Sequence, residues 1–159
     1  MKGAGSLSQF VIIYAQLIFM KKIIIYTDGG SRGNPGSAAV GIYIEDSRGN
    51  KIASIGKKIG IATNNVAEYS AIIEAFNWFL KNINELENVE KIFFNVDSEL
   101  AYSQLSGLYK IKNSAIRELV FKIRQHEAEL KIPVVYQHIP REKNKKADLL
   151  VNLALDNLL

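Results

Sequence analysis

The chain has 159 residues, of which 48% are apolar and 23% are charged, and it carries a formal net charge of +4. This length and apolar content suffice for one domain with a sizeable core, and they exclude a disordered or fibrous protein. The small basic excess is compatible with a polyanionic partner such as a nucleic acid.

Cysteine is absent, and the only two histidines are His126 and His138. The missing thiols exclude disulfides, thiolate zinc sites and cysteine nucleophiles. Two histidines leave little material for a zinc site, which normally needs three or four nitrogen or sulfur ligands, or for a serine hydrolase, which needs a histidine base. We therefore expect any hydrolytic chemistry to depend on carboxylates.

The N-terminal region contains an apolar run from Phe10 to Met20. The run is too short to span a membrane. It also lacks the arrangement of a secretory signal, because Lys2 is the only charge before it and Lys21 and Lys22 follow it. We therefore expect Met20 to be the native start and residues 1–19 to come from an upstream start. Residues 1–20 then form an N-terminal extension, and residues 21–159 form one cytoplasmic domain without a membrane segment.

The first part of that domain has the pattern of three strands. Residues 22–27 are short, β-branched and buried in character, which is typical of a strand covered on both faces. The turn-rich stretch from Gly29 to Gly36 predicts a loop. Residues 38–45 and 51–59 flank a polar segment suited to a β-hairpin connection.

The remaining elements alternate between helix and strand. Apolar residues recur at three and four from Val66 to Ile83, which predicts an amphipathic helix. We expect a strand over residues 91–96, helices over 98–105 and 114–130, and a strand over 133–138. Asn144 can cap a final helix that runs through Leu158.

The resulting order, β-β-β-α-β-α-α-β-α, predicts an α/β fold with an antiparallel meander on one side of the sheet and parallel strands on the other. Ligands in such sheets bind beyond the carboxyl ends of the parallel strands. Asp28 and Asp97 follow two of these strands.

Four acidic residues stand at strand ends or in first helical turns, and each has an ordinary structural explanation. Asp28 suits a turn, and Glu68 lies three residues after Asn65, the spacing of a capping box. Asp97 could cap a helix, and Asp148 could complement a helix dipole.

Together, however, four converging carboxylates would repel one another unless divalent cations were bound, and Mg²⁺ prefers carboxylate oxygens and water. Two such ions held about 4 Å apart can activate a water and stabilise the leaving oxygen of a phosphodiester. The basic residues Arg141, Lys143, Lys145 and Lys146 precede Asp148 and could form a solvated face or contact phosphate. The glycine spacing fits no nucleotide-binding loop.

Four sequence blocks resemble type 1 ribonuclease H in content and order. They are residues 26–36 (YTDGGSRGNPG), 63–69 (TNNVAEY), 96–98 (VDS) and 146–148 (KAD). The resemblance covers the chain from about Lys21 onward, and it implies a five-stranded mixed sheet flanked by helices, the ribonuclease H-like fold.

The resemblance implies an endonuclease that cuts the RNA strand of RNA/DNA hybrids and leaves 3′-hydroxyl and 5′-phosphate ends. Two Mg²⁺ ions, replaceable by Mn²⁺, would be bound by Asp28, Glu68, Asp97 and Asp148. The substrate would be contacted by Gly29, Gly30, Ser31, Asn34, Asn64, Asn65 and Ser98, and we add Arg141 as a contact from its place before Asp148.

Two departures from the family pattern concern substrate grip and turnover. Many bacterial relatives carry a histidine just before the last aspartate, whereas this chain reads Pro-Arg-Glu-Lys-Asn at residues 140–144. We expect Arg141 to take over phosphate contact there and His138 to be structural. The region from Gly107 to Ser114 is too short for the basic protrusion of some members, so we expect modest affinity.

With these two departures the chain resembles a compact archaeal and bacterial subgroup. Cleavage of double-stranded RNA is a further activity that this resemblance leaves open. We expect a monomer. Two alternatives remain, a hybrid-binding module without catalysis and a related carboxylate-dependent exonuclease.

Overall fold

The computed structural model describes residues 21–159. The predicted N-terminal extension, residues 1–20, lies outside the described residues and stays a prediction. Within residues 21–159, no helix combines the length and the apolar content that crossing a membrane requires.

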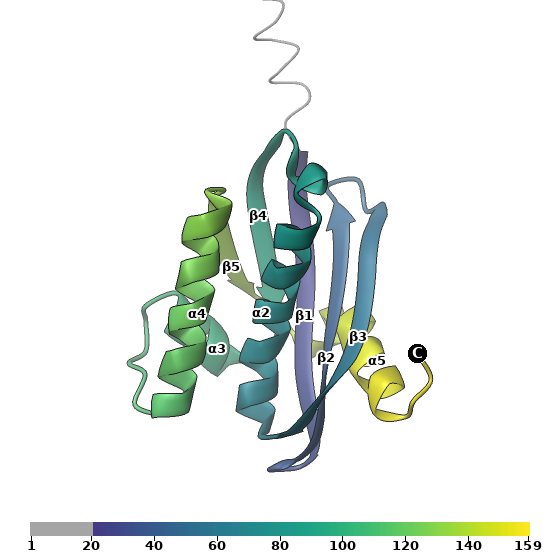
Figure 1. Cartoon of the computed structure of the whole chain (residues 1–159), viewed down its shortest axis with the longest axis vertical. Coiled ribbons are helices and arrows are strands. Elements are labelled where there is room, and N and C mark those ends of the chain that lie inside the picture. Colours follow the sequence, from purple (N-terminus) through teal and green to yellow (C-terminus); the bar gives the residue numbers. More distant parts are fainter. Residues whose placement is uncertain (1–20) are drawn as a thin grey trace, which may run out of the picture.

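One five-stranded sheet forms the centre of the molecule (Figure 1). Its strands, in the spatial order β3-β2-β1-β4-β5, are β3 (Lys51–Ala62), β2 (Gly36–Asp46), β1 (Lys21–Gly33), β4 (Val89–Val96) and β5 (Val134–His138). β1, β2 and β3 pair antiparallel, whereas β1–β4 and β4–β5 are parallel. The predicted mixed sheet is confirmed.

Between residues 21 and 159, four helices flank this sheet. α2 (Asn64–Lys81) and α4 (Ser114–Leu130) pack together on one face, and α5 (Lys145–Leu155) packs against β1, β2 and β3 on the other (Figure 1). α3 (Glu99–Leu105) is short, as are the 3₁₀ turns η1 (Ile83–Leu86) and η2 (Arg141–Lys143).

The helix predicted from Val66 onward is confirmed as α2, whose apolar side faces the core. Phe76 is completely buried and stacks on Phe94 of β4, with ring centroids 4.9 Å apart. Thr63 caps the helix by accepting a hydrogen bond from the Val66 N–H at 3.2 Å. The alternative that Glu68 completes a capping box with Asn65 is therefore wrong.

The stretch from Gly29 to Gly36 is mostly strand, so the loop predicted there is wrong. β1 continues to Gly33 in antiparallel register with β2, and only Asn34 and Pro35 form the turn between Gly33 and Gly36. Turn-forming composition is a local preference, and the ladder of hydrogen bonds with a neighbouring strand overrides it.

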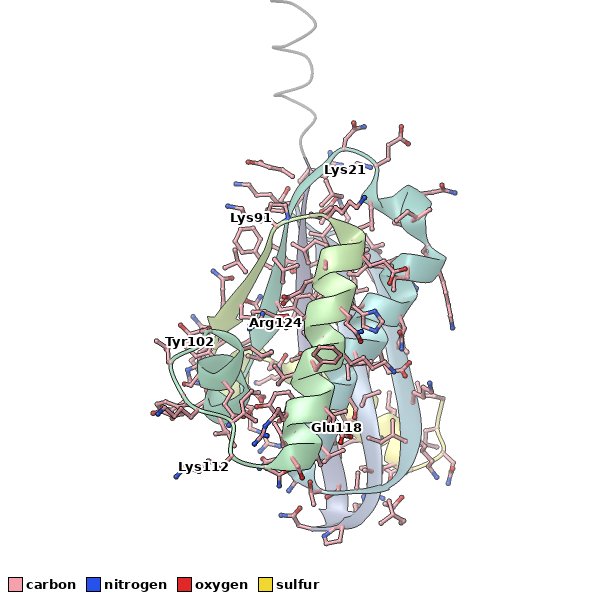
Figure 2. The ribbon with its side chains drawn as sticks, turned by 60° about the vertical axis from the view of Figure 1, so that its left-hand side comes forward. Lys21, Lys91, Tyr102, Lys112, Glu118 and Arg124 are labelled. Atoms are coloured by element: carbon pink, nitrogen blue, oxygen red, sulfur yellow. The ribbon has the colours of Figure 1, made fainter. Side chains whose placement is uncertain are left out.

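The end of α5 differs from the prediction, and the connection between α3 and α4 is as short as predicted. α5 ends at Leu155 instead of Leu158, and Asn157 adopts a left-handed conformation with a φ of 56°. Residues 106–113 connect α3 to α4 without another helix. Figure 2 labels Lys112 in this connection, and Glu118 and Arg124 farther along the chain on α4.

Candidate metal centre and active site

Asp28 and Asp97 are neighbours at one edge of the parallel half of the sheet. The parallel pairing of β1 with β4 ends at Thr27 and Val96, so the next residue of each chain segment is an aspartate. Asp28 is only 5% exposed, whereas Asp97 is half-buried.

Glu68 is brought to the same edge by a close approach between α2 and β1. A Cβ atom on Gly29 would lie 2.1 Å from the carbonyl carbon of Ala67, so the backbones meet without room for a side chain. Glu68 is the next residue of the helix. Glycine is thus required at position 29 by packing, in addition to any contact with substrate.

The three carboxylates form a cluster. Asp28, Glu68 and Asp97 each offer an oxygen, and these oxygens all lie within 4.8 Å of one another. Burial and the neighbouring charges of Asp97 and Asp148 raise the pKa of Asp28 to about 7. Burial, together with Asp28 and Asp97, also raises the pKa of Glu68 well above its usual range. Such a cluster is a natural site for hard divalent cations, which relieve the repulsion.

Asp148 lies in the first turn of α5, as predicted, but it is not part of the three-residue cluster. It lines the same cleft, and its Oδ1 is 3.3 Å from a guanidinium nitrogen of Arg141. A Cβ atom on Gly41 would lie 2.1 Å from the Ala147 carbonyl oxygen, so α5 touches β2 one residue before Asp148. Gly41 is also the cross-strand partner of Asp28. This close approach determines how far Asp148 lies from Asp28.

Asn144 precedes α5, but its side chain does not cap the helix as predicted. Its amide nitrogen instead donates to the carbonyl of Thr27 at 2.8 Å and to Oδ2 of Asp97 at 3.1 Å. The side chain is fully buried, so it connects α5 to the edge that carries the carboxylates.

Of the four basic residues before Asp148, Arg141 is the one that lines the cleft. Lys146 turns away, and its ammonium lies 2.8 Å from a Glu45 carboxylate oxygen and 4.2 Å from the ring centre of Tyr43. This ion pair holds the first turn of α5 against β2.

An open cleft of about 430 Å³ surrounds the carboxylates. The predicted site residues that line it are Asp28, Gly29, Gly30, Ser31, Asn64, Glu68, Asp97, Arg141 and Asp148. The Asn64 side-chain oxygen accepts a hydrogen bond from the Ser31 N–H at 2.8 Å, and the Asn34 oxygen accepts one from the Asn64 N–H at 3.1 Å. These bonds tie the β1–β2 turn to the start of α2.

The other predicted substrate-binding residues lie elsewhere. Asn34 and Asn65 line a second pocket, together with Thr63, which caps α2. Ser98 caps α3 by accepting a hydrogen bond from the Ala101 N–H at 3.2 Å. His138 is exposed, with Nε2 3.2 Å from the Asp97 carbonyl oxygen and its ring stacked on Tyr102.

Sequence reasoning missed Gly41, the second role of Asn144, and Arg32, which also lines the cleft. A glycine inside a strand pattern is a signal of close backbone approach, so Gly41 could have been found. No local signal distinguishes an asparagine that caps a helix from one that bridges two distant segments.

Residues 26–154 match the sequence profile of the family described as reverse transcriptase-like. A ribonuclease H1 named LC11, isolated from compost by a metagenomic approach, has a similar structure, with a TM-score of 0.81 and 46% sequence identity over 86% of this chain and 96% of that chain. A second structure of LC11, in complex with RNA/DNA hybrid, gives a TM-score of 0.80 at 44% identity over 85% of this chain and 97% of that chain.

Ribonuclease HI of Halobacterium salinarum is 36% identical over 86% of this chain and 65% of its own length. The bifunctional protein Rv2228c of Mycobacterium tuberculosis is 35% identical over 85% of this chain and 36% of its own length. The chain therefore spans between about a third and two thirds of these curated relatives.

Proposed function

Because the chain belongs to the ribonuclease H family, we propose that it is an endonuclease that hydrolyses the RNA strand of RNA/DNA hybrids. The observation that carries this proposal is the cluster of Asp28, Glu68 and Asp97 at the base of an open cleft, with Asp148 on its wall. Hydrolysis by this site needs neither a cysteine nor a histidine nucleophile.

The donor set fits divalent cations. It offers carboxylate oxygens alone, and burial together with mutual repulsion raises the pKa values of Asp28 and Glu68, which is the cost that a bound cation relieves. We infer that two Mg²⁺ ions, or Mn²⁺ in their place, would supply water activation and stabilisation of the leaving oxygen. In this proposal Asp28, Glu68 and Asp97 would hold the ions, and Asp148 would complete the site.

The polar residues around the cluster suit a nucleic-acid duplex with an A-like minor groove. Such a groove is recognised by shape and by contacts to 2′-hydroxyls and phosphates, with little base specificity. Gly29, Gly30, Ser31 and Asn64 line the cleft, and Asn34 and Asn65 line the pocket next along the start of α2. Ser98 follows Asp97 directly. We propose these residues as substrate contacts, with Arg141 as the phosphate contact beside Asp148.

The proposal includes 3′-hydroxyl and 5′-phosphate products, a monomeric enzyme and a cytoplasmic location. Cleavage of double-stranded RNA is a further activity that the same cleft would permit, because both duplexes present an A-like minor groove.

A side-by-side cleavage assay tests the proposal. Internally labelled RNA/DNA hybrid, RNA duplex and DNA duplex are incubated with the protein and Mg²⁺ or Mn²⁺, and the products are sized and their ends identified. We expect internal cuts in the RNA strand of the hybrid that stop when the metal is chelated. Products shortened only from the 3′ end would favour the exonuclease alternative.

The matched variant is Asp97→Asn, which keeps the shape of the side chain. We expect it to fold normally and to lose cleavage by about a thousandfold or more, because the site loses several kcal/mol of metal-dependent transition-state stabilisation. Full activity of this variant would overturn the assignment. Hybrid binding without any cleavage by the wild type would favour the non-catalytic alternative.

A further inference from the structure

Arg32 is a second arginine of the carboxylate cleft, beside Arg141. The two arginines contact opposite ends of α5. Arg141 pairs with Asp148 in the first turn of the helix, and Arg32 pairs with Asp156, the residue after its last turn, at 2.5 Å. Cations therefore stand at both ends of the helix that forms one wall of the cleft.

The strand geometry determines how Arg32 relates to the metal cluster. Side chains alternate along a strand, so Asp28, Gly30 and Arg32 belong to the same face of β1. A Cβ atom on Gly30 would meet Val151 of α5, and Arg32 itself reaches Asp156, so this face looks towards α5. Four residues of strand span about 13 Å, which separates Arg32 from the position of the scissile phosphate.

We propose that Arg32 binds a backbone phosphate that flanks the scissile phosphate, and that Asp156 holds its guanidinium only until substrate arrives. The inference rests on the proposed function, since it names a second phosphate contact of the same cleft. A guanidinium presents a planar set of donors that matches phosphate oxygens. A nucleic-acid strand carries a phosphate at every nucleotide, so a cation beside the metal site can contact a phosphate that flanks the scissile one.

The Arg32–Asp156 pair is suited to exchange. The two side chains are 52% and 43% exposed, and ion pairs that water can reach are weak. A phosphate that enters the cleft offers the same guanidinium a charged partner with oxygens for two parallel hydrogen bonds. Asp156 then acts as a competitor for Arg32.

The alternative is that the pair only fastens the end of α5 to β1. The two readings predict opposite signs for Asp156→Asn. If Asp156 competes with phosphate, its neutralisation frees Arg32 and tightens hybrid binding. If the pair only stabilises the position of α5, the same substitution destabilises that position and weakens hybrid binding, just as the loss of Arg32 does.

The test measures binding of an uncleaved RNA/DNA hybrid by fluorescence anisotropy with Mg²⁺, over a series of salt concentrations, in the Asp97→Asn background. The variants Arg32→Ala and Asp156→Asn are added singly. Matched controls are Arg48→Ala and Asp46→Asn, which alter another surface ion pair, 3.6 Å long, at the far end of β2, in which Arg48 is 84% and Asp46 22% exposed. Thermal melts of every variant check that it folds.

We expect Arg32→Ala to weaken binding about five- to tenfold and to reduce the slope of log K against log salt by about 0.9, the value for one phosphate contact. We expect Asp156→Asn to tighten binding about two- to fivefold, the range that the strength of an exposed ion pair allows. The control substitutions should change affinity by less than about twofold.

The inference is wrong if Arg32→Ala and Arg48→Ala bind the hybrid with equal affinity. It is also wrong if Asp156→Asn binds the hybrid more weakly and melts at a lower temperature. Either result leaves the proposed function intact provided that the protein with Asp97 restored cuts the hybrid. Absence of both cutting and binding by the wild type would refute the proposed function itself.

Discussion

The side-chain amide of Asn144 donates a hydrogen bond to the Asp97 carboxylate, with Nδ2 and Oδ2 3.1 Å apart. The same nitrogen donates to the carbonyl of Thr27, the residue before Asp28, and the Asn144 carbonyl accepts the N–H of Asp148 at 3.1 Å. One buried residue therefore joins the three chain segments that carry the aspartates of the site.

We expect Asn144→Ala to lower Mn²⁺ affinity and cleavage about 10- to 100-fold, because residues that orient metal ligands have effects of this size. The free energy of unfolding should fall by about 2 kcal/mol, since a buried Thr27 carbonyl and an aspartate oxygen lose their donor. Isothermal titration calorimetry with Mn²⁺ and urea unfolding measure the two effects separately.

The control for this variant is Asn113→Ala, because Asn113 caps α4 by accepting the Ile116 N–H at 3.1 Å and does not line the carboxylate cleft. It should lose about 1 kcal/mol of stability with no change in Mn²⁺ affinity. If Asn144→Ala behaves in the same way, Asn144 has only a structural role.

The stability of the metal-free protein should depend on Asp28. Its pKa rises from 3.8 in the unfolded chain to about 7 in the folded protein, so the folded state holds the proton more tightly over this range. The resulting stabilisation is complete below pH 4 and is lost as the pH rises through 7. We expect the melting temperature in EDTA to fall by about 5–10 °C between pH 5 and pH 8.

Asp28→Asn should show a smaller fall over the same pH range, because the neutral amide has no proton to lose. It should also show little of the increase in melting temperature that Mg²⁺ produces in the wild type at pH 8. The pKa of Asp46 is lowered by hydrogen bonds from Asn50, so this group stays ionised from pH 5 to pH 8 and Asp46→Asn should leave the fall unchanged. The raised pKa would be contradicted if the wild-type melting temperature in EDTA rose from pH 5 to pH 8, and if that rise were larger than the rise in Asp28→Asn.

Gly41→Ala should displace α5 and with it Asp148. The added methyl group would lie 2.1 Å from the Ala147 carbonyl oxygen, so the helix must move. We expect a loss of about 1–3 kcal/mol in the free energy of unfolding and a reduced cleavage rate. Gly49 has a φ of 83° and nothing within 4 Å of its added Cβ, so Gly49→Asn is a tolerated control. Wild-type stability of Gly41→Ala would refute the close approach.

Arg141→Ala should lower kcat/KM for hybrid about tenfold at low salt, because a charge-assisted phosphate contact is lost. The effect should shrink as salt rises, and Arg141→Lys should restore part of it. Lys143→Ala removes the same charge from the same exposed 3₁₀ turn and should have a smaller effect. Equal effects of the two alanine variants would reduce Arg141 to a general contribution of positive charge.

Local sequence predicted most of the elements and named acids that come together at one edge of the sheet. The three-and-four spacing from Val66 to Ile83 predicted α2, since one side of a helix must be apolar to pack on a sheet. Four sequence blocks indicated the family, and they contain Asp28, Glu68, Asp97 and Asp148. In each block the residues next to the acid match the family motif, and the blocks follow one another in the family order.

Only the tertiary structure decided how these residues meet. The glycine-rich stretch after Asp28 became strand because β2 pairs with it, and Asn144 turned its amide to Asp97 because packing brings α5 over β1. The separation of Asp148 from the three-carboxylate cluster depends on the close contact at Gly41, 107 positions earlier in the chain. Hydrogen bonds and contacts between distant segments are absent from local propensity, so sequence patterns could name the acids but not arrange them.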